Sequence, residues 1–165
     1  MVLNQEGENM ESKEELLFSL NKSVENLIFE ISKVIKNNMI DDEKSVYYAV
    51  GTSLHWIGTC LDRINQVDIM EEHKGIISAF KGAINAQKHN KDLIRFDSFM
   101  NCSILPFTLE AVLSDRGLFF WSKLNSNIFK WKNQEQNYKD YLEYNDVKST
   151  ILQIQDIIVD YFKEI

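Results

Sequence analysis

The chain has 165 residues with a formal net charge of −7, and 44% of its residues are hydrophobic. This composition is that of an ordinary globular protein, long enough to fold around one core without a metal or a disulfide framework. No apolar run approaches the roughly 20 residues that span a bilayer, and the polar, acidic start of the chain does not resemble a signal peptide. We therefore expect a cytoplasmic protein with no membrane segment.

The start of the chain is predicted to be a short mobile segment, followed by one helical domain. Residues 1–10 are polar without an apolar period, and residues 11–165 form the domain. Ser12 and Glu15 have the spacing of a capping box, in which a hydroxyl and a carboxylate satisfy free backbone N–H groups at a helix start. Apolar residues follow at intervals of three and four, so we expect a first helix from Ser12 to about residue 37.

Two further helices are predicted in the first half of the chain. A second apolar stripe covers residues 46–64, after two aspartates that can cap its start. Gly51 and Gly58 lie within this stripe, where each costs about 1 kcal/mol of helix stability relative to Ala. Their spacing of seven residues favours the close approach of another helix. A third helix is predicted over residues 71–91.

The apolar period changes after Phe96. The segments 101–106 and 117–123 flank Asp115, Arg116 and Gly117, which favour a turn. The second segment is rich in aromatic residues and resembles a strand. We therefore predict a small β-hairpin over about 101–123. A buried helix is the alternative, because short apolar runs do not distinguish the two.

The last part of the chain returns to helical spacing. Residues 134–144 are predicted to form a short helix, and an apolar stripe from Val147 to Ile165 defines a final one, with Asn145 or Asp146 at its start. The fold class is therefore all-α: a four-helix-type bundle with a small β-hairpin insertion before the C-terminal helices.

Charge is distributed unevenly along the chain. Residues 1–72 hold 6 Lys and Arg against 14 Asp and Glu, residues 73–132 hold 9 against 4, and residues 133–165 hold 3 against 7. The acidic total argues against non-specific binding of nucleic acid. The basic middle leaves room for a local anion site, and a solvated helix face is the alternative explanation.

The third predicted helix and the residues after it carry a basic stripe. Four basic residues recur every seven positions: Lys74, Lys81, Lys88 and Arg95. Seven residues are close to two helical turns, so these positions lie on one face if the helix continues that far. Asn85 and His89 lie at the margin of the stripe, beside Lys81 and Lys88. A lysine can neutralise a phosphate, and a histidine can transfer protons near neutral pH. These residue types are sufficient for metal-independent RNA cleavage. A solvent-exposed histidine beside a solvated lysine stripe is the alternative.

The run from Asn85 through His89 to Asn90 resembles the core of the HEPN motif, in which an arginine and a polar residue are followed a few residues later by a histidine. The resemblance extends to the all-helical layout, over roughly residues 12–96 and the last helix. It implies a four-helix bundle of the kind found in prokaryotic defence and toxin–antitoxin ribonucleases. It also implies a homodimer in which two motifs, each near the start of a late helix, form a composite site.

The chain departs from the HEPN motif at one position. Ile84 stands where the family has its arginine, and the nearest upstream basic residue is Lys81, one helical turn earlier. Arginine supplies a planar, permanently charged fork for a phosphate, whereas isoleucine supplies no such group. Several HEPN-like domains are thought to bind RNA or protein partners without cleavage, and we expect the same here. His89 and Asn85 would be catalytic residues only if the chain is an enzyme.

Other residues were assigned from their surroundings. Trp131 lies between two lysines and is predicted to be exposed, where an indole can stack on an unpaired base. Expected nucleic-acid contacts are Lys81, Lys88, Lys91 and Trp131. His55 adjoins an apolar position and is expected to be a buried, hydrogen-bonded histidine. Cys60 and Cys102 lie apart from any CxxC pair, so we expect two reduced, buried thiols.

The sequence predicts no cofactor, because it lacks a P-loop, a nucleophile elbow and any zinc-binding pattern. Three functions remain. The first is a HEPN-like domain of a defence or toxin–antitoxin system that binds RNA or a protein partner, such as an antitoxin, without cleavage. The second is a small helical phage or bacterial regulator that acts by protein–protein interaction. The third is a metal-independent ribonuclease that uses His89.

Overall fold

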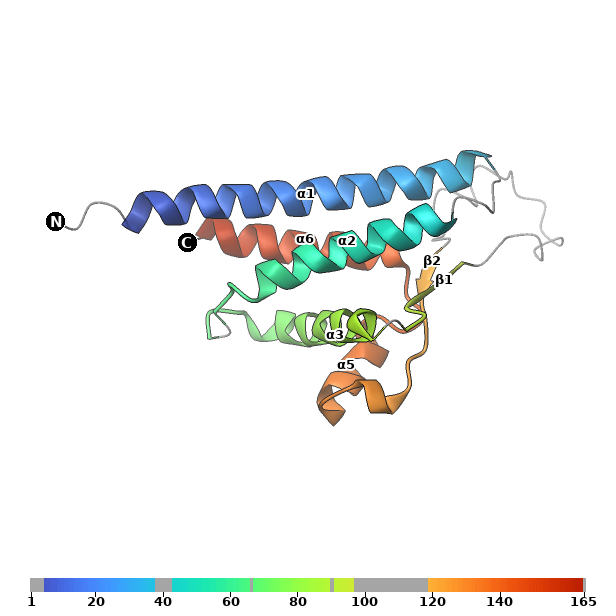
Figure 1. Ribbon diagram of the computed structural model, residues 1–165. Coiled ribbons are helices and arrows are strands. Elements are labelled where there is room, and N and C mark those ends of the chain that lie inside the picture. The colour runs from blue at the N-terminus through green and yellow to red at the C-terminus, as the bar shows by residue number, and fades with distance from the viewer. Residues whose placement is uncertain (1–4, 38–42, 66, 90, 97–118, 165) are drawn as a thin grey trace.

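The structure, a computed structural model, describes residues 5–37, 43–65, 67–89, 91–96 and 119–164. Within these residues the chain forms a helical bundle with one two-stranded sheet (Figure 1), which confirms the predicted fold class. The helices are α1 (Gln5–Asn37), α2 (Glu43–Leu61), α3 (Glu71–Lys88), the 3₁₀-helix η3 (Ser126–Ile128), α5 (Lys132–Tyr141) and α6 (Val147–Glu164). The strands are β1 (Ile94–Phe96) and β2 (Phe119–Trp121).

The longest helix, α1, lies along one side of the bundle against α2 and α6 (Figure 1). It begins at Gln5, so Ser12 lies within the helix and does not cap its start, contrary to the prediction. Its buried face carries apolar residues at helical spacing from Leu16 to Val34. The buried Ser53 hydroxyl of α2 donates a hydrogen bond to the Ser23 carbonyl oxygen at 3.2 Å. This bond joins α2 to α1 within the core.

The helix α3 ends at Lys88, three residues before the predicted end at residue 91. His89 follows as the C-cap, and its backbone N–H donates to the Ala86 carbonyl oxygen at 3.1 Å. The basic stripe therefore does not continue to Arg95, because Arg95 lies on β1. Its guanidinium carbon lies 4.9 Å from the centre of the Tyr144 ring.

The two strands pair antiparallel, with Ile94 opposite Trp121 and Phe96 opposite Phe119. The aromatic strand was predicted within 117–123, and β2 confirms it. Its partner was predicted at 101–106, which lies outside the described residues; the observed partner, β1, comes directly after α3. Trp121 is fully buried, and its indole N–H donates to the Thr150 hydroxyl of α6 at 2.7 Å. The sheet is thereby attached to the start of α6.

The last helix begins as predicted. The Asp146 carboxylate accepts a hydrogen bond from the Ser149 backbone N–H at 2.7 Å, which is the geometry of a helix N-cap. Every third or fourth residue of α6 from Val147 to Ile158 is fully buried. The short helix α5 lies on the far side of α3 from α1 (Figure 1). This placement of α5 forms the site described next.

Candidate functional site

A cleft of about 740 Å³ lies between α2, α3 and the segment that leads into α5. Its walls carry both polar and apolar side chains. The lining residues are His55, Gly58, Thr59, Leu61, Asp62, Lys81, Ile84, Asn85, Gln87, Lys88, Lys130, Trp131 and Gln134. We call it the basic cleft, because its lining, among the residues that the structure describes, includes three lysines and a single carboxylate.

The floor of the basic cleft forms where α2 and α3 approach closely. A Cβ atom placed on Gly58 would lie 3.3 Å from Cδ1 of Ile84, so the absence of a side chain lets the two helices meet. The Gln87 side-chain amide donates to the Gly51 carbonyl oxygen at 3.1 Å and ties α3 to α2 a second time. The close helix approach predicted from Gly51 and Gly58 is therefore confirmed.

The third wall of the basic cleft, the segment that leads into α5, packs against α3. A Cβ atom on Gly82 would lie 3.0 Å from the Phe129 ring, and one on Gly75 would lie 2.5 Å from the Tyr141 ring. The Asn85 side-chain amide donates to the Ile128 carbonyl oxygen at 2.8 Å. Two small residues and one hydrogen bond thus hold the segment that carries Lys130 and Trp131 beside α3.

Polar contacts also join the turn before α5 to that helix. Glu135 accepts hydrogen bonds from the Lys139 ammonium group and the Ser126 hydroxyl, both at 2.7 Å. These bonds, led by the one from Lys139, lower the pKa of the Glu135 carboxyl group. Tyr138 is buried below, where its hydroxyl donates to the Ser122 carbonyl oxygen at 2.7 Å. Burial raises the pKa of Tyr138 above its usual value. The segment is therefore anchored at both ends.

The lysines of the basic cleft are available for a ligand. Among the residues that the structure describes, Lys81, Lys88 and Lys130 have no carboxylate within ion-pair distance. Lys130 instead lies with its ammonium nitrogen 5.1 Å from the centre of the Trp131 ring. That indole is 60% exposed, as predicted. Unpaired ammonium groups beside an exposed aromatic face can bind phosphate and a stacked base together.

The structure brings together four of the six predicted site residues. Lys81, Asn85, Lys88 and Trp131 line the same cleft, although Trp131 is remote from the other three in sequence. His89 and Lys91 are exposed beyond the end of α3 and do not line it. Asn90, the last residue of the HEPN-like run, lies outside the described residues.

Two details bear on the predicted catalytic group. The resemblance implies a motif near the start of a helix, whereas Asn85 and His89 lie at the end of α3. The Asn85 amide is engaged by a backbone carbonyl, which gives it a structural role.

His55, predicted to be buried, is exposed and lines the basic cleft; its ring packs edge-on against Trp56, with 5.2 Å between the ring centres. One residue beyond the buried Leu54, a side chain turns about 100° away from the core.

Sequence reasoning missed the α2 wall of the basic cleft. His55, Thr59 and Asp62 follow one another at intervals of four and three residues, with Gly58 among them. A polar set at this spacing on an otherwise apolar helix predicts a solvated face. Lys130 was considered only as a neighbour of Trp131, because its distance from α3 depends on the packing of α5.

A second, smaller pocket of about 330 Å³ lies between α6 and the first half of α3. Its floor is apolar, with Ile69, Ile77 and Ile157, and its rim carries several charged groups. Its lining includes three aspartates and one histidine, Asp68, Asp156, Asp160 and His73. We call it the acidic pocket. In the part of the chain that the structure describes, no three ligating side chains are placed to hold a metal ion.

No helix among the described residues is both long and apolar enough to cross a membrane. Comparisons of the chain with protein-family models, with curated proteins and with solved structures find no match. Function is therefore inferred from the basic cleft and from the residues that form it.

Proposed function

We propose that the chain binds single-stranded RNA in the basic cleft and does not cleave it. The observation that supports this most strongly is that Lys130 and Trp131 line the same cleft as Lys81 and Lys88. Lysines can neutralise successive phosphates, and an exposed indole can stack on a base of any identity. The HEPN-like run of residues is the reason to place this binding in a prokaryotic defence or toxin–antitoxin setting.

The absence of cleavage is proposed from the roles of three residues. Ile84 stands at the position of the arginine of the HEPN motif and packs at the floor of the cleft. The Asn85 amide is bonded to the chain itself, and His89 does not line the cleft. RNA bound in the basic cleft would therefore contact walls to which the histidine that the motif assigns to proton transfer does not contribute.

The test is fluorescence anisotropy with a short, labelled, single-stranded RNA at low salt. Replacing both lysines in Lys81→Glu/Lys88→Glu should weaken binding by more than about tenfold. The slope of log affinity against log salt should fall by about 1.4, because two phosphate contacts are lost. The matched control is Lys148→Glu/Lys163→Glu on α6, which changes the net charge equally but leaves the cleft intact. Equal affinities for the wild type and the cleft variant would refute the proposal.

The same RNA, analysed on a denaturing gel, tests the absence of cleavage. We expect intact RNA after prolonged incubation with the wild-type chain. Cleavage that disappears in His89→Ala would restore the ribonuclease interpretation with the predicted residue. Cleavage that disappears in His55→Ala would instead place proton transfer within the basic cleft, because His55 lines it. Either result contradicts the proposed absence of cleavage. The proposed RNA binding is tested separately by the anisotropy measurement.

A further inference from the structure

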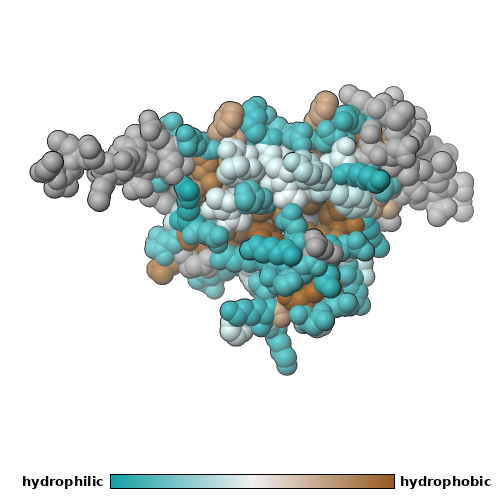
Figure 2. All heavy atoms as spheres, viewed as in Figure 1, coloured by the Kyte–Doolittle hydropathy of each residue, from teal (hydrophilic) through white to brown (hydrophobic). Residues whose placement is uncertain are grey.

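The outer face of α1 carries two large apolar side chains in contact with solvent. Phe18 is 63% exposed and Phe29 is 58% exposed. Figure 2 shows isolated light-brown groups along the upper edge of the molecule, over α1. The two residues are eleven positions apart, which on a straight helix is about 16 Å of rise and a rotation of about 20°. They therefore lie on one side of the helix, opposite its buried face.

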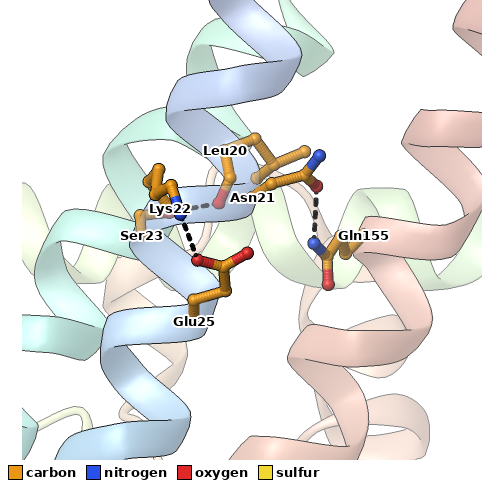
Figure 3. Close-up of polar contacts among 6 residues, drawn as sticks. All are labelled: Leu20, Asn21, Lys22, Ser23, Glu25 and Gln155. Atoms are coloured by element: carbon orange, nitrogen blue, oxygen red, sulfur yellow. Dashed lines mark hydrogen bonds and ion pairs between the residues drawn. The ribbon is translucent and has the colours of Figure 1, made fainter.

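Two charged residues lie between these phenylalanines on the same face of α1. Lys22 and Glu25 form an ion pair at 2.7 Å, and their side chains are 58% and 63% exposed. Figure 3 shows this pair along α1, while the neighbouring Asn21 points towards Gln155 of α6. The outer face thus forms a seam with alternating intervals of three and four residues: Glu15, Phe18, Lys22, Glu25, Phe29 and Ser32. This is the spacing of the contact positions of a coiled coil.

We infer that this seam pairs with the same seam of a second copy, with the two α1 helices antiparallel. A two-fold axis between residues 23 and 24 places Phe18 against Phe29 of the second copy. The same axis places Lys22 against Glu25 of the second copy, and each contact occurs twice. The seam is therefore complementary to itself in both shape and charge, as a two-fold interface requires.

The parallel arrangement of the same helices is less favourable. In register, it would place Lys22 beside Lys22 of the second copy, and Glu25 beside Glu25, so that like charges would repel. Antiparallel helices also align their dipoles favourably. Charge complementarity therefore selects one of the two orientations.

The apolar area of the seam is that of a weak dimer. A phenylalanine side chain buries about 150–250 Å², so at these exposures each ring has on the order of 100 Å² left to cover. Four rings give on the order of 400 Å² of apolar area, small beside the roughly 1,600 Å² of a standard interface. We expect a dimer that dissociates in the micromolar range. No residue of α1 lines the basic cleft, so the dimer leaves both clefts open.

Analytical ultracentrifugation without RNA tests the dimer over a dilution series from high micromolar to submicromolar concentration. The mass should rise from 19.3 kDa towards twice that value with concentration. Lys22→Glu and Glu25→Lys should each abolish association, because each creates two like-charge contacts. Their equimolar mixture should recover it, because every contact then pairs opposite charges. Tyr48→Ser, which removes an exposed ring from α2, is the control that should leave association unchanged. A wild type that stays monomeric throughout, or a mixture that stays monomeric, would overturn the inference.

A disulfide experiment tests the orientation separately. Glu15→Cys and Ser32→Cys are introduced into separate chains that also carry Cys60→Ala and Cys102→Ser. The antiparallel seam brings residue 15 of one copy to residue 32 of the other, so oxidation should yield the mixed disulfide from the mixture and little dimer from either chain alone. Disulfides within each single-variant sample would show a parallel pairing and refute the antiparallel one. Circular dichroism on every variant checks that the helices are retained.

Discussion

The basic cleft and the acidic pocket use opposite halves of α3. The first half contributes His73 and Ile77 to the acidic pocket, and the second half contributes Lys81 and Lys88 to the basic cleft. The helix α3 has acidic residues in its first turn and a basic residue in its last, as helix electrostatics favours, but the carboxylates of the acidic pocket come from Asp68 and from α6. Lys130 and Trp131 do not belong to α3, so the helix dipole does not account for them. Their addition to one end of α3 is the basis for the RNA binding that we propose there.

The difference between the two sites depends most on the docking of α5, which walls the basic cleft only. In Gly75→Ala the new methyl group would lie 2.5 Å from the Tyr141 ring, so we expect a loss of about 2 kcal/mol of stability from overpacking. RNA affinity should fall as well, because Lys130 and Trp131 move with α5. Urea denaturation and anisotropy measure the two effects.

Repeating Gly75→Ala in the Tyr141→Ala variant tests whether the loss of stability comes from contact with the Tyr141 ring. In Tyr141→Ala the ring is absent, and Gly75→Ala should then stabilise the protein by about 1 kcal/mol, because alanine is the better helix former. A sign that does not reverse between the two backgrounds would show that α5 does not pack on Gly75 as described.

The aromatic side chain at the mouth of the basic cleft should have the next largest effect. Trp131→Ala should lower RNA affinity about tenfold, which is the contribution of stacking one base. Stability should be unchanged, because the ring is 60% exposed. The salt slope should also be unchanged, since no phosphate contact is removed. A change in the slope would assign Trp131 to backbone positioning instead.

The acidic pocket should have the smallest effect on RNA binding. Replacing its three aspartates in Asp68→Asn/Asp156→Asn/Asp160→Asn removes negative charge that repels RNA from a distance. Affinity should rise less than about threefold at low salt and not at all at 0.15 M salt, where the Debye length is about 8 Å. A larger increase, measured by the same anisotropy assay, would mean that RNA passes close to both sites.

Local periodicity in the sequence was sufficient to predict the α-helices, including the short one before α6, but not the 3₁₀-helix η3. It failed where tertiary packing decides. The apolar segment around Ile94 is too short to indicate a strand, so β1 was not predicted as the partner of β2. The end of α3 at Lys88 has no Gly or Pro signal nearby, so the basic stripe was extended to Arg95. The basic cleft joins α3 to a segment about forty residues later in the chain. Periodicity in the sequence indicates local structure only, so it does not predict such a long-range contact.

The buried thiol of Cys60 is a chemical probe of local opening in this bundle. Its side chain is fully buried on α2, and burial raises the pKa of the thiol to about 12. At neutral pH it is therefore a protonated thiol out of reach of reagents, whereas alkylation requires an accessible thiolate. With Cys102 replaced by serine, the rate at which a maleimide modifies Cys60 would measure how often α2 opens to solvent. Ligand-dependent protection of that one atom would then report whether RNA holds the helices of the cleft together.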